Sequence, residues 1–236
     1  MSETIEFTKD RATKTLSAAK ELAPQWTWQE KTIPSIEAAL VAIIGNRAVD
    51  PPIIGQEEVV SVAETTMLGA RGAWDEQLDL LHRRTMQGVG MAKNRCRDDA
   101  TKMVILRNLS ARGTSRKETL EEALAWESAW AKVDPTWAPL SSNTLAAFKT
   151  LRKRCSEDLK TAYADAYTDW SGECGKLADM AASLEDTCQA WYADATRVFE
   201  VGTPEGNMIR RTIPTTYTPP HKPAPTPAPP KDPPAQ

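Results

Sequence analysis

The residues best suited to metal binding or catalysis in this sequence are a histidine and the acidic residue one helical turn before it. His82 follows Asp79 by three residues, which gives a single Asp-x-x-His pattern. Helical bundles of the ferritin type bind two metal ions through a carboxylate-x-x-His pattern on each of two helices. Here the only other histidine, His221, lies in a proline-rich segment. We therefore interpret His82 as a helix-surface residue and expect no metal and no cofactor.

Other chemical motifs are also missing from the sequence. The chain has no Gly-x-Ser-x-Gly elbow and no phosphate-binding Gly-x-x-x-x-Gly-Lys loop. Gly88 and Gly90 lack the third glycine of a dinucleotide-binding turn. Cys174 and Cys188 are 14 residues apart in one expected helix, which separates them by about 21 Å and excludes a disulfide between them. We expect all four cysteines to be free thiols.

Composition points to a helical protein without a membrane span. The chain has 236 residues and a formal net charge of −3, which gives no electrostatic reason to expect nucleic acid as a partner. No apolar run approaches the roughly 20 residues that cross a bilayer, and the N-terminus does not resemble a signal peptide, so the cytoplasm is the expected location. Ten of the 17 prolines lie at or after Pro214, which leaves a body that favours long helices.

Helical periodicity predicts an all-α protein, an elongated antiparallel bundle of the four-helix type. The expected helices cover residues 4–23, 35–47, 56–112, 115–133 and 141–201. Ser115 and Glu118 form a capping-box pattern at the start of the fourth helix. We expect Ser141 or Ser142 to cap the last helix and Gly172 or Gly175 to bend it. Residues 38–44, the longest apolar cluster, are expected to be buried, and Gly113 is expected to adopt a left-handed conformation.

The last helix carries the most regular apolar seam. Its members alternate steps of three and four residues, the heptad pattern of bundles and coiled coils: Cys174, Leu177, Ala181, Leu184, Cys188, Trp191, Ala195 and Val198. The first long helix carries a similar seam of Trp74, Leu78, Leu81, Val89, Ala92, Cys96 and Met103. Both helices are therefore expected to form the spine of the bundle.

Short landmarks recur in the same order along the chain and indicate an internal duplication. Trp74 returns as Trp170, and the run 99–102 (Asp-Ala-Thr-Lys) returns as 194–197 (Asp-Ala-Thr-Arg). We predict a bundle over residues 1–203, built from related units at about 4–114 and 115–203. An extended proline-rich tail is expected over residues 204–236, with the polyproline II conformation from Pro214 onward.

Three sets of residues are candidates for contacts with partners. Tryptophans are either core anchors or, where exposed, interface residues; the candidates are Trp28, Trp126, Trp130 and Trp137. Basic residues near helix ends either complement the helix dipole or bind an acidic partner; the candidates are Arg152, Lys153 and Arg154. Prolines of the tail fit aromatic-lined grooves; the candidates are Pro219, Pro220 and Pro223.

The sequence favours architecture over chemistry, because none of the repeated landmarks is a catalytic residue in a catalytic setting. We expect a non-enzymatic structural or protein-interaction module that self-associates, with the tail as a connecting or docking arm. One alternative is an enzyme or a ligand- or metal-binding bundle, which needs buried, convergent side chains around Glu76, Asp79 and His82. Another alternative is an adaptor that docks an acidic partner on a basic helix face. The sequence specifies no small-molecule ligand.

Overall fold

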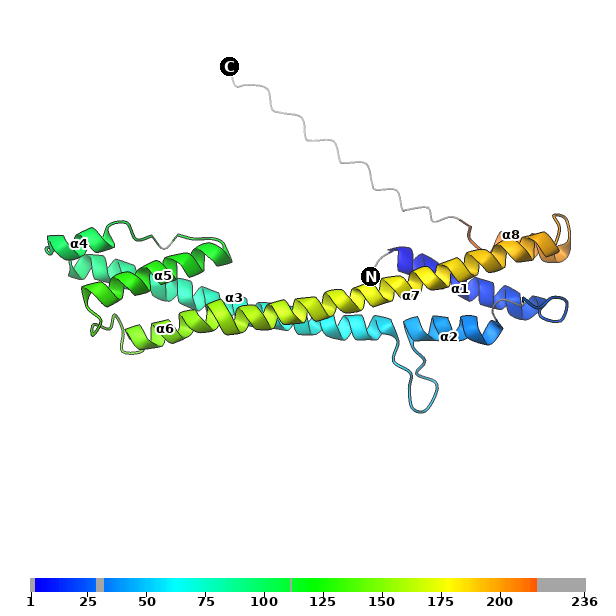
Figure 1. The fold of residues 1–236 in the computed structure, drawn as a ribbon, viewed down its shortest axis with the longest axis horizontal. Helices are drawn as coiled ribbons and strands as arrows, with labels where there is room; N and C mark the ends of the chain where they lie inside the picture. Colours follow the sequence, from blue (N-terminus) through cyan, green and yellow to red (C-terminus); the bar gives the residue numbers. More distant parts are fainter. Residues whose placement is uncertain (1–2, 29–31, 111, 216–236) are drawn as a thin grey trace, which may run out of the picture. The chain divides into compact units, whose positions relative to one another are not determined.

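The computed structural model describes residues 3–28, 32–110 and 112–215, and every regular element in these ranges is a helix (Figure 1). This confirms the predicted all-α helical bundle. In the described part of the chain, none of the helices combines the length and apolarity needed to cross a membrane. The chain divides into two compact units, one of residues 1–55 with 177–236 and the other of residues 56–176. We call them unit 1 and unit 2.

Unit 1 contains α1 (Glu3–Leu22), α2 (Ile33–Ile44), the part of α7 (Leu159–Val198) from Leu177 onward, and α8 (Pro204–Thr212). Helix α1 packs against both α2 and α8. The predicted heptad seam of α7 is confirmed here, because its members are buried at six positions: Leu177, Ala181, Leu184, Cys188, Trp191 and Ala195. Val198, the last seam residue, is half exposed, so the buried part of the seam ends at Ala195.

Helix α8 lies in the segment that the sequence assigned to an extended tail, and that assignment is wrong for residues 204–212. Gly202 lies just before α8 and has a positive φ of +98°. The Thr203 hydroxyl then accepts a hydrogen bond from the Gly206 amide and caps α8. Ile209 and Ile213 are buried. The Arg210 guanidinium donates to the carbonyls of Phe199, Gly206 and Thr196 at 3.2, 2.9 and 3.1 Å, which ties α8 to the end of α7.

A buried ion pair joins α1 to α7 inside unit 1. The Arg11 side chain is 4% exposed, and its guanidinium donates to the Glu185 carboxylate, which is 19% exposed. Gln189 also donates to this carboxylate, at 2.9 Å. Arg11 Nε, Glu185 Oε2 and the Thr15 hydroxyl are buried without a hydrogen-bond partner. The charges of Arg11 and Glu185 therefore depend mainly on each other.

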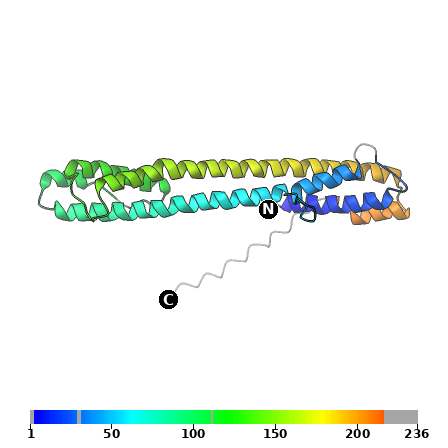
Figure 2. The same cartoon turned by 90° about the horizontal axis from the view of Figure 1, so that it is seen from below.

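Unit 2 contains α3 (Gln56–Arg95), α4 (Ala100–Leu106), α5 (Arg116–Val133), α6 (Leu145–Lys153), a π-helical segment η1 (Arg154–Asp158) and the first part of α7. Figures 1 and 2 show α3 and α7 running side by side in this unit, with α5 and α6 against the C-terminal half of α3. The Ser115–Glu118 capping box and the helix end at Asp134 are as predicted.

The predicted helix over residues 56–112 is interrupted. Helix α3 ends at Arg95, and α4 restarts after a turn at Ala100. The Asp99 carboxylate accepts a hydrogen bond from the Lys102 amide at 3.1 Å and caps α4, a signal that the periodicity of the apolar residues concealed. Gly113 does not adopt the expected left-handed conformation, because Gly45 and Gly202 are the glycines with positive φ in the described ranges.

The last long helix also differs from its prediction. Thr144, rather than Ser141 or Ser142, caps it, through its hydroxyl and the Ala147 amide. The helix does not break at Gly172 or Gly175, and its irregularity is instead the π-helical segment Arg154–Asp158. The Trp74 indole donates to the Cys155 carbonyl at 2.9 Å, so a helix-backbone group in this segment is bound by a side chain of α3.

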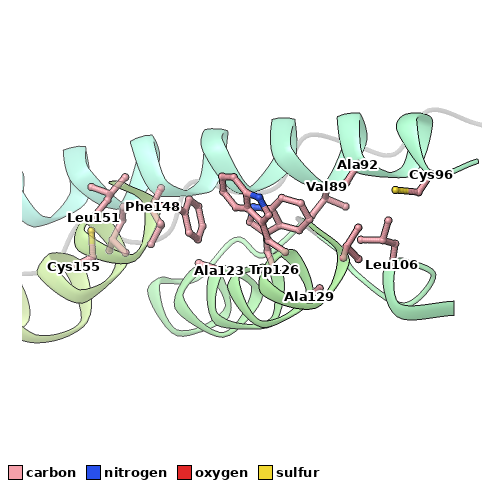
Figure 3. Close-up of a cluster of buried hydrophobic side chains, with 14 of the residues drawn as sticks. Val89, Ala92, Cys96, Leu106, Ala123, Trp126, Ala129, Phe148, Leu151 and Cys155 are labelled. Carbon is pink, nitrogen blue, oxygen red and sulfur yellow. The ribbon is translucent and has the colours of Figure 1, made fainter. Parts of the chain in front are cut away.

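Stacked aromatic rings form the core of unit 2. The rings of Trp126 and Trp130 on α5 are 5.2 Å apart and nearly parallel, and Phe148 of α6 packs 5.9 Å from Trp130. Figure 3 shows Trp126 reaching across to α3, where Gly88 leaves room for its indole. None of the four cysteines, all of which lie in the described ranges, forms a disulfide, as expected. Burial raises the pKa of the Cys155 thiol to about 11, which keeps it protonated at neutral pH.

The compact units do not coincide with the two predicted repeats. Unit 1 combines segments that are far apart in the sequence: α1 contacts α7 through Arg11 and Glu185, and α8 contacts α7 through Arg210 and the Thr196 carbonyl. Trp74 is buried, whereas its proposed counterpart Trp170 is only half-buried. The duplication itself stays a prediction.

Replacing Gly88 by alanine should destabilise unit 2. The new Cβ would lie 2.7–2.8 Å from the Trp126 indole, and overpacking of this kind costs about 1–3 kcal/mol. The free energy of unfolding, measured by urea titration, should fall by that amount. Gly90→Ala is the matched control: no atom lies within 4 Å of its Cβ position, so it should stabilise α3 by about 0.5–1 kcal/mol. Equal effects of the two substitutions would contradict this assignment.

Removing one partner of the Arg11–Glu185 pair should lower the free energy of unfolding far more than replacing both partners. Glu185→Leu leaves a buried guanidinium unpaired and should lower the free energy of unfolding by about 3–5 kcal/mol. The double variant Arg11→Met/Glu185→Leu should recover most of that loss, because an apolar pair of similar size needs no compensating charge. Thermal and urea unfolding of the three proteins would measure this, and a double variant less stable than Glu185→Leu would refute it.

Candidate protein-interaction groove

Helix α2 is apolar on all sides, yet most of it is not buried. Thr32 caps the helix and Pro34 occupies its first turn, both favourable for helix initiation. Glu37 is the single charged residue among its 12 residues. Its buried residues are Ile36, Leu40 and Ile43. A helix that is hydrophobic all round is normally enclosed by protein or lipid, so the exposed sides of α2 call for an explanation.

The sequence predicted that residues 38–44 are buried, and this is wrong for four of them. Ala38, Ala39, Ala42 and Ile44 are exposed. The length of an apolar run does not reveal how many sides of a helix its neighbours cover. In unit 1, α1 covers one side of α2 and pairs its Lys20 with Glu37 at 3.1 Å. The opposite side stays open.

An open groove of about 670 Å³ lies between α2 and α7 in unit 1. Helix α2 lines it with Thr32, Ser35, Ile36, Ala39 and Ala42, and α7 lines it with Asp179, Met180, Ser183, Leu184 and Thr187. Most of these side chains are small, and Asp179 is the only ionisable group among them. The Thr187 hydroxyl donates to the Ser183 carbonyl at 2.8 Å within α7. The groove therefore offers apolar contacts and close approach to two helix backbones.

The loop after α2 extends the exposed apolar surface of unit 1. Asn46 and Ile53 exchange two backbone hydrogen bonds of 2.8 Å, and the Asn46 side chain accepts a third from the Ala48 amide. The loop exposes Val49 and Ile53, and Ile54 directly after it is 64% accessible. Its apolar side chains are thus held in a defined conformation next to the C-terminus of α2.

The residues proposed for an alternative polar site do not converge. Glu76 and Asp79 are exposed, and His82 is half-buried with its Nδ1 atom enclosed and without a hydrogen-bond partner. Within the described ranges, no three His, Cys, Asp or Glu residues are grouped as metal ligands. The buried, convergent arrangement that the enzyme or ligand-binding alternative required around Glu76, Asp79 and His82 is not formed.

The tryptophans proposed as interface residues lie mostly in the interior. Trp126 and Trp130 are buried in unit 2, where the Trp130 indole donates to the Trp137 carbonyl at 2.9 Å. Trp28 is buried in unit 1 and donates to the Asp194 carboxylate at 2.9 Å. Trp137 is half-buried beneath the Arg95 guanidinium, 5.1 Å from its ring centre. The interpretation as core anchors is therefore the correct one for Trp28, Trp126 and Trp130.

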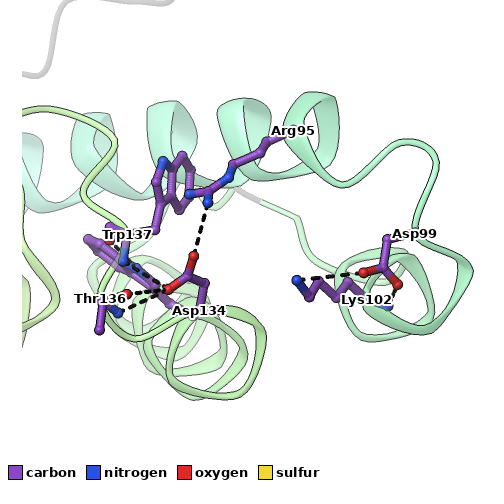
Figure 4. Close-up of polar contacts among 7 residues, drawn as sticks. Arg95, Asp99, Lys102, Asp134, Thr136 and Trp137 are labelled. Carbon is purple, nitrogen blue, oxygen red and sulfur yellow. Dashed lines mark hydrogen bonds and ion pairs between the residues drawn. The ribbon is translucent and has the colours of Figure 1, made fainter.

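Several basic residues of unit 2 are paired with acidic residues of the same unit. Figure 4 shows Arg95 beside Asp134, at 3.0 Å, and Lys102 beside Asp99. Hydrogen bonds from Thr136 and the Trp137 amide help to hold the pKa of the Asp134 carboxyl below its usual range. This internal pairing lowers the charge that the helix faces can offer to an acidic partner.

Two of the three basic candidates are paired in the same way. Arg152 binds the half-buried Glu127 at 2.6 Å, and Lys153 lies 3.8 Å from Glu157. Arg154 is exposed. The tail candidates Pro219, Pro220 and Pro223 lie outside the described residues.

The Asp75–Arg116 pair should make a pH-dependent contribution to stability. Arg116 donates two hydrogen bonds to Asp75, at 2.7 and 2.8 Å, and holds the pKa of that carboxyl below its ordinary value. The unfolded chain therefore binds the proton more tightly, so the contribution is complete above about pH 4, the unfolded value, and is lost as the pH falls through the lower folded pKa. Asp75→Asn should be less stable than the wild type at neutral pH and nearly equal to it at about pH 2. Thermal melts across this range measure the difference, and a difference that does not change with pH would contradict the assignment.

Unit 1 thus combines an exposed apolar helix, a groove lined by small side chains and an ordered apolar loop. This arrangement is suited to contact with another protein, and sequence reasoning missed it because exposure depends on how many neighbours α2 has. A signal was present in Ala38, Ala39 and Ala42, because small residues are common where helices approach closely. Comparison of the chain with protein-family models, with curated proteins and with solved structures gave no match.

Proposed function

We propose that this protein is a non-enzymatic interaction module that self-associates, and that α2 and its groove form a contact between two copies. One observation carries the proposal. Helix α2 has one charged residue in 12 and buries only Ile36, Leu40 and Ile43 within its own chain. Exposed apolar surface of this kind marks protein-interaction sites in soluble proteins.

The occupant proposed for the groove is α2 of a second copy. A two-fold contact places the same patch of both chains together, so the exposed sides of two α2 helices would face each other. Ser35, Ala39 and Ala42 are small enough for two helix backbones to approach closely. Burial of this surface stabilises the contact by about 25 cal/mol for each Å² of apolar area removed from water.

Light scattering on the purified full chain tests the proposal. The wild type should have a mass above that of one chain, and the mass should fall on dilution. Ala39→Glu places a charge in the groove and should weaken this association at least tenfold, because a buried unpaired carboxylate costs several kcal/mol.

Ile44→Glu is the matched control. Ile44 is on the same helix and 45% exposed, and it does not line the groove. If association required only general apolar character, Ile44→Glu would weaken it more than Ala39→Glu, since it removes the larger apolar side chain. That result, or a wild type that is monomeric at all concentrations, would refute the proposal. Circular dichroism should show equal helix content for the three proteins.

A further inference from the structure

Four aromatic rings form a continuous row in unit 2 and lead from its core to its surface. Trp74 of α3 is buried, and its ring lies 5.7 Å from that of Tyr163 on α7. Along α7 the row continues to Tyr167, at 6.2 Å, and then to Trp170, at 5.7 Å. Tyr167 is 48% exposed, and Tyr163 and Trp170 are half-buried. We call Tyr163, Tyr167 and Trp170 the aromatic row.

The first ring of the aromatic row is held in place by a fixed cation. The Arg116 guanidinium lies 4.7 Å from the Trp74 ring centre and 5.6 Å from the Tyr163 ring centre. Its two hydrogen bonds to Asp75 fix its position. A surface that is ordered before binding loses less entropy when a partner arrives.

The side of α7 next to the aromatic row carries small, uncharged residues. The residue that follows each ring is exposed; these residues are Ala164, Thr168 and Ser171. The Thr168 hydroxyl donates to the Ala164 carbonyl at 2.9 Å, so its polar atom is already bound. Asp165 and Asp169 come two residues after Tyr163 and Tyr167 and therefore point to another side of the helix. The row thus borders an uncharged surface without large side chains.

Two polar groups of the aromatic row are available to a partner. Among the described residues, neither the Tyr167 hydroxyl nor the Trp170 indole N–H has a hydrogen-bond partner. A suitable partner therefore offers apolar rings or methyl groups together with free carbonyl groups. Helices and strands use their carbonyls internally, whereas a polyproline II segment has no internal hydrogen bonds and leaves them free.

The chain itself contains a segment with this chemistry. Nine of residues 216–236 are prolines, and these residues lie outside the described ranges. Residues 223–230 include five of the prolines and no charged residue, a composition that favours polyproline II. That conformation repeats every three residues, or about 9 Å. Tyr163 and Trp170 are seven helical residues apart, or about 10.5 Å, so Pro227 and Pro230 have nearly the same spacing as the two ends of the aromatic row.

We propose that the aromatic row binds residues 223–230 of a second copy. Proline rings pack on the exposed aromatic surface, and carbonyls of the segment accept hydrogen bonds from Tyr167 and Trp170, the mode by which aromatic surfaces bind proline-rich segments. The uncharged segment meets the uncharged side of α7, so no charge is buried without a partner. The contact uses neither α2 nor its groove and is independent of the contact proposed there.

Disulfide cross-linking between full chains tests the proposal. One protein carries Ser171→Cys and a second carries Ala228→Cys, both with Cys174→Ser to remove the half-exposed native thiol. Mixed in equal amounts and oxidised mildly, they should give a dimer containing one chain of each. Asp165→Cys in place of Ser171→Cys is the matched control, because Asp165 is exposed on another side of α7. It should give at least tenfold less mixed dimer.

Two alanine substitutions separate the aromatic row from general contact with α7. Tyr167→Ala, added to the Ser171→Cys protein, should lower the yield of mixed dimer at least tenfold. Tyr192→Ala should not, because Tyr192 is a half-buried tyrosine of α7 that lies outside the row. Circular dichroism should show equal helix content for the two variants.

Three results would overturn the proposal: no mixed dimer, a yield from Asp165→Cys equal to that from Ser171→Cys, or equal effects of the two alanine substitutions. A protein with both Ser171→Cys and Ala228→Cys should link between chains, and links only within one chain would rule out a second copy as the source of the segment. Adding Ala39→Glu to both proteins should leave the mixed dimer intact, which distinguishes failure of the groove contact from failure of this one.

Discussion

A 40-residue helix is stable in water mainly where other helices cover its apolar seam, and this protein has two such helices, α3 and α7. In the C-terminal half of α3, α5 and α6 provide that cover. Trp126 inserts against Gly88, and Trp130 and Phe148 continue the ring stack. In the N-terminal half of α3, Met67 and Trp74 are buried, whereas Val62 and Leu68 are 62% and 51% exposed. Neighbouring helices therefore cover the apolar surface of α3 to different extents along its length.

In unit 1, other helices cover the apolar seam on the C-terminal part of α7. Its seam is enclosed with the help of α1, which is joined to α7 through Arg11 and Glu185, and of α8, which Arg210 ties to the last turn of α7 and the segment after it. Helix α2 joins this bundle through one side only. The proposed contact of α2 with a second copy therefore concerns a helix that is more apolar than its covered surface requires.

Local signals predicted much of the helical framework. The capping box at Ser115 and Glu118 and the end of that helix before Asp134 were correctly identified, because each depends on a few neighbouring residues. The helix boundaries that were predicted wrongly are places where two local sequence patterns favour different structures. Asp99 ends the long helix by capping a new one within an unbroken apolar period, and α8 was hidden by the prolines that follow it. The candidate surfaces were missed for a different reason: an apolar period marks a contact face but does not say whether a neighbour is present.

The sequence by itself determined the all-α class, the heptad seam of α7 and the free state of the cysteines, because periodicity and spacing are properties of the chain alone. Only the tertiary structure decided which seams are covered. It placed Trp28, Trp126 and Trp130 in the interior, left Glu76 and Asp79 in solvent, and exposed one side of α2. Burial is a property of the neighbours that a residue has in space, and those neighbours come from segments that are far away along the chain.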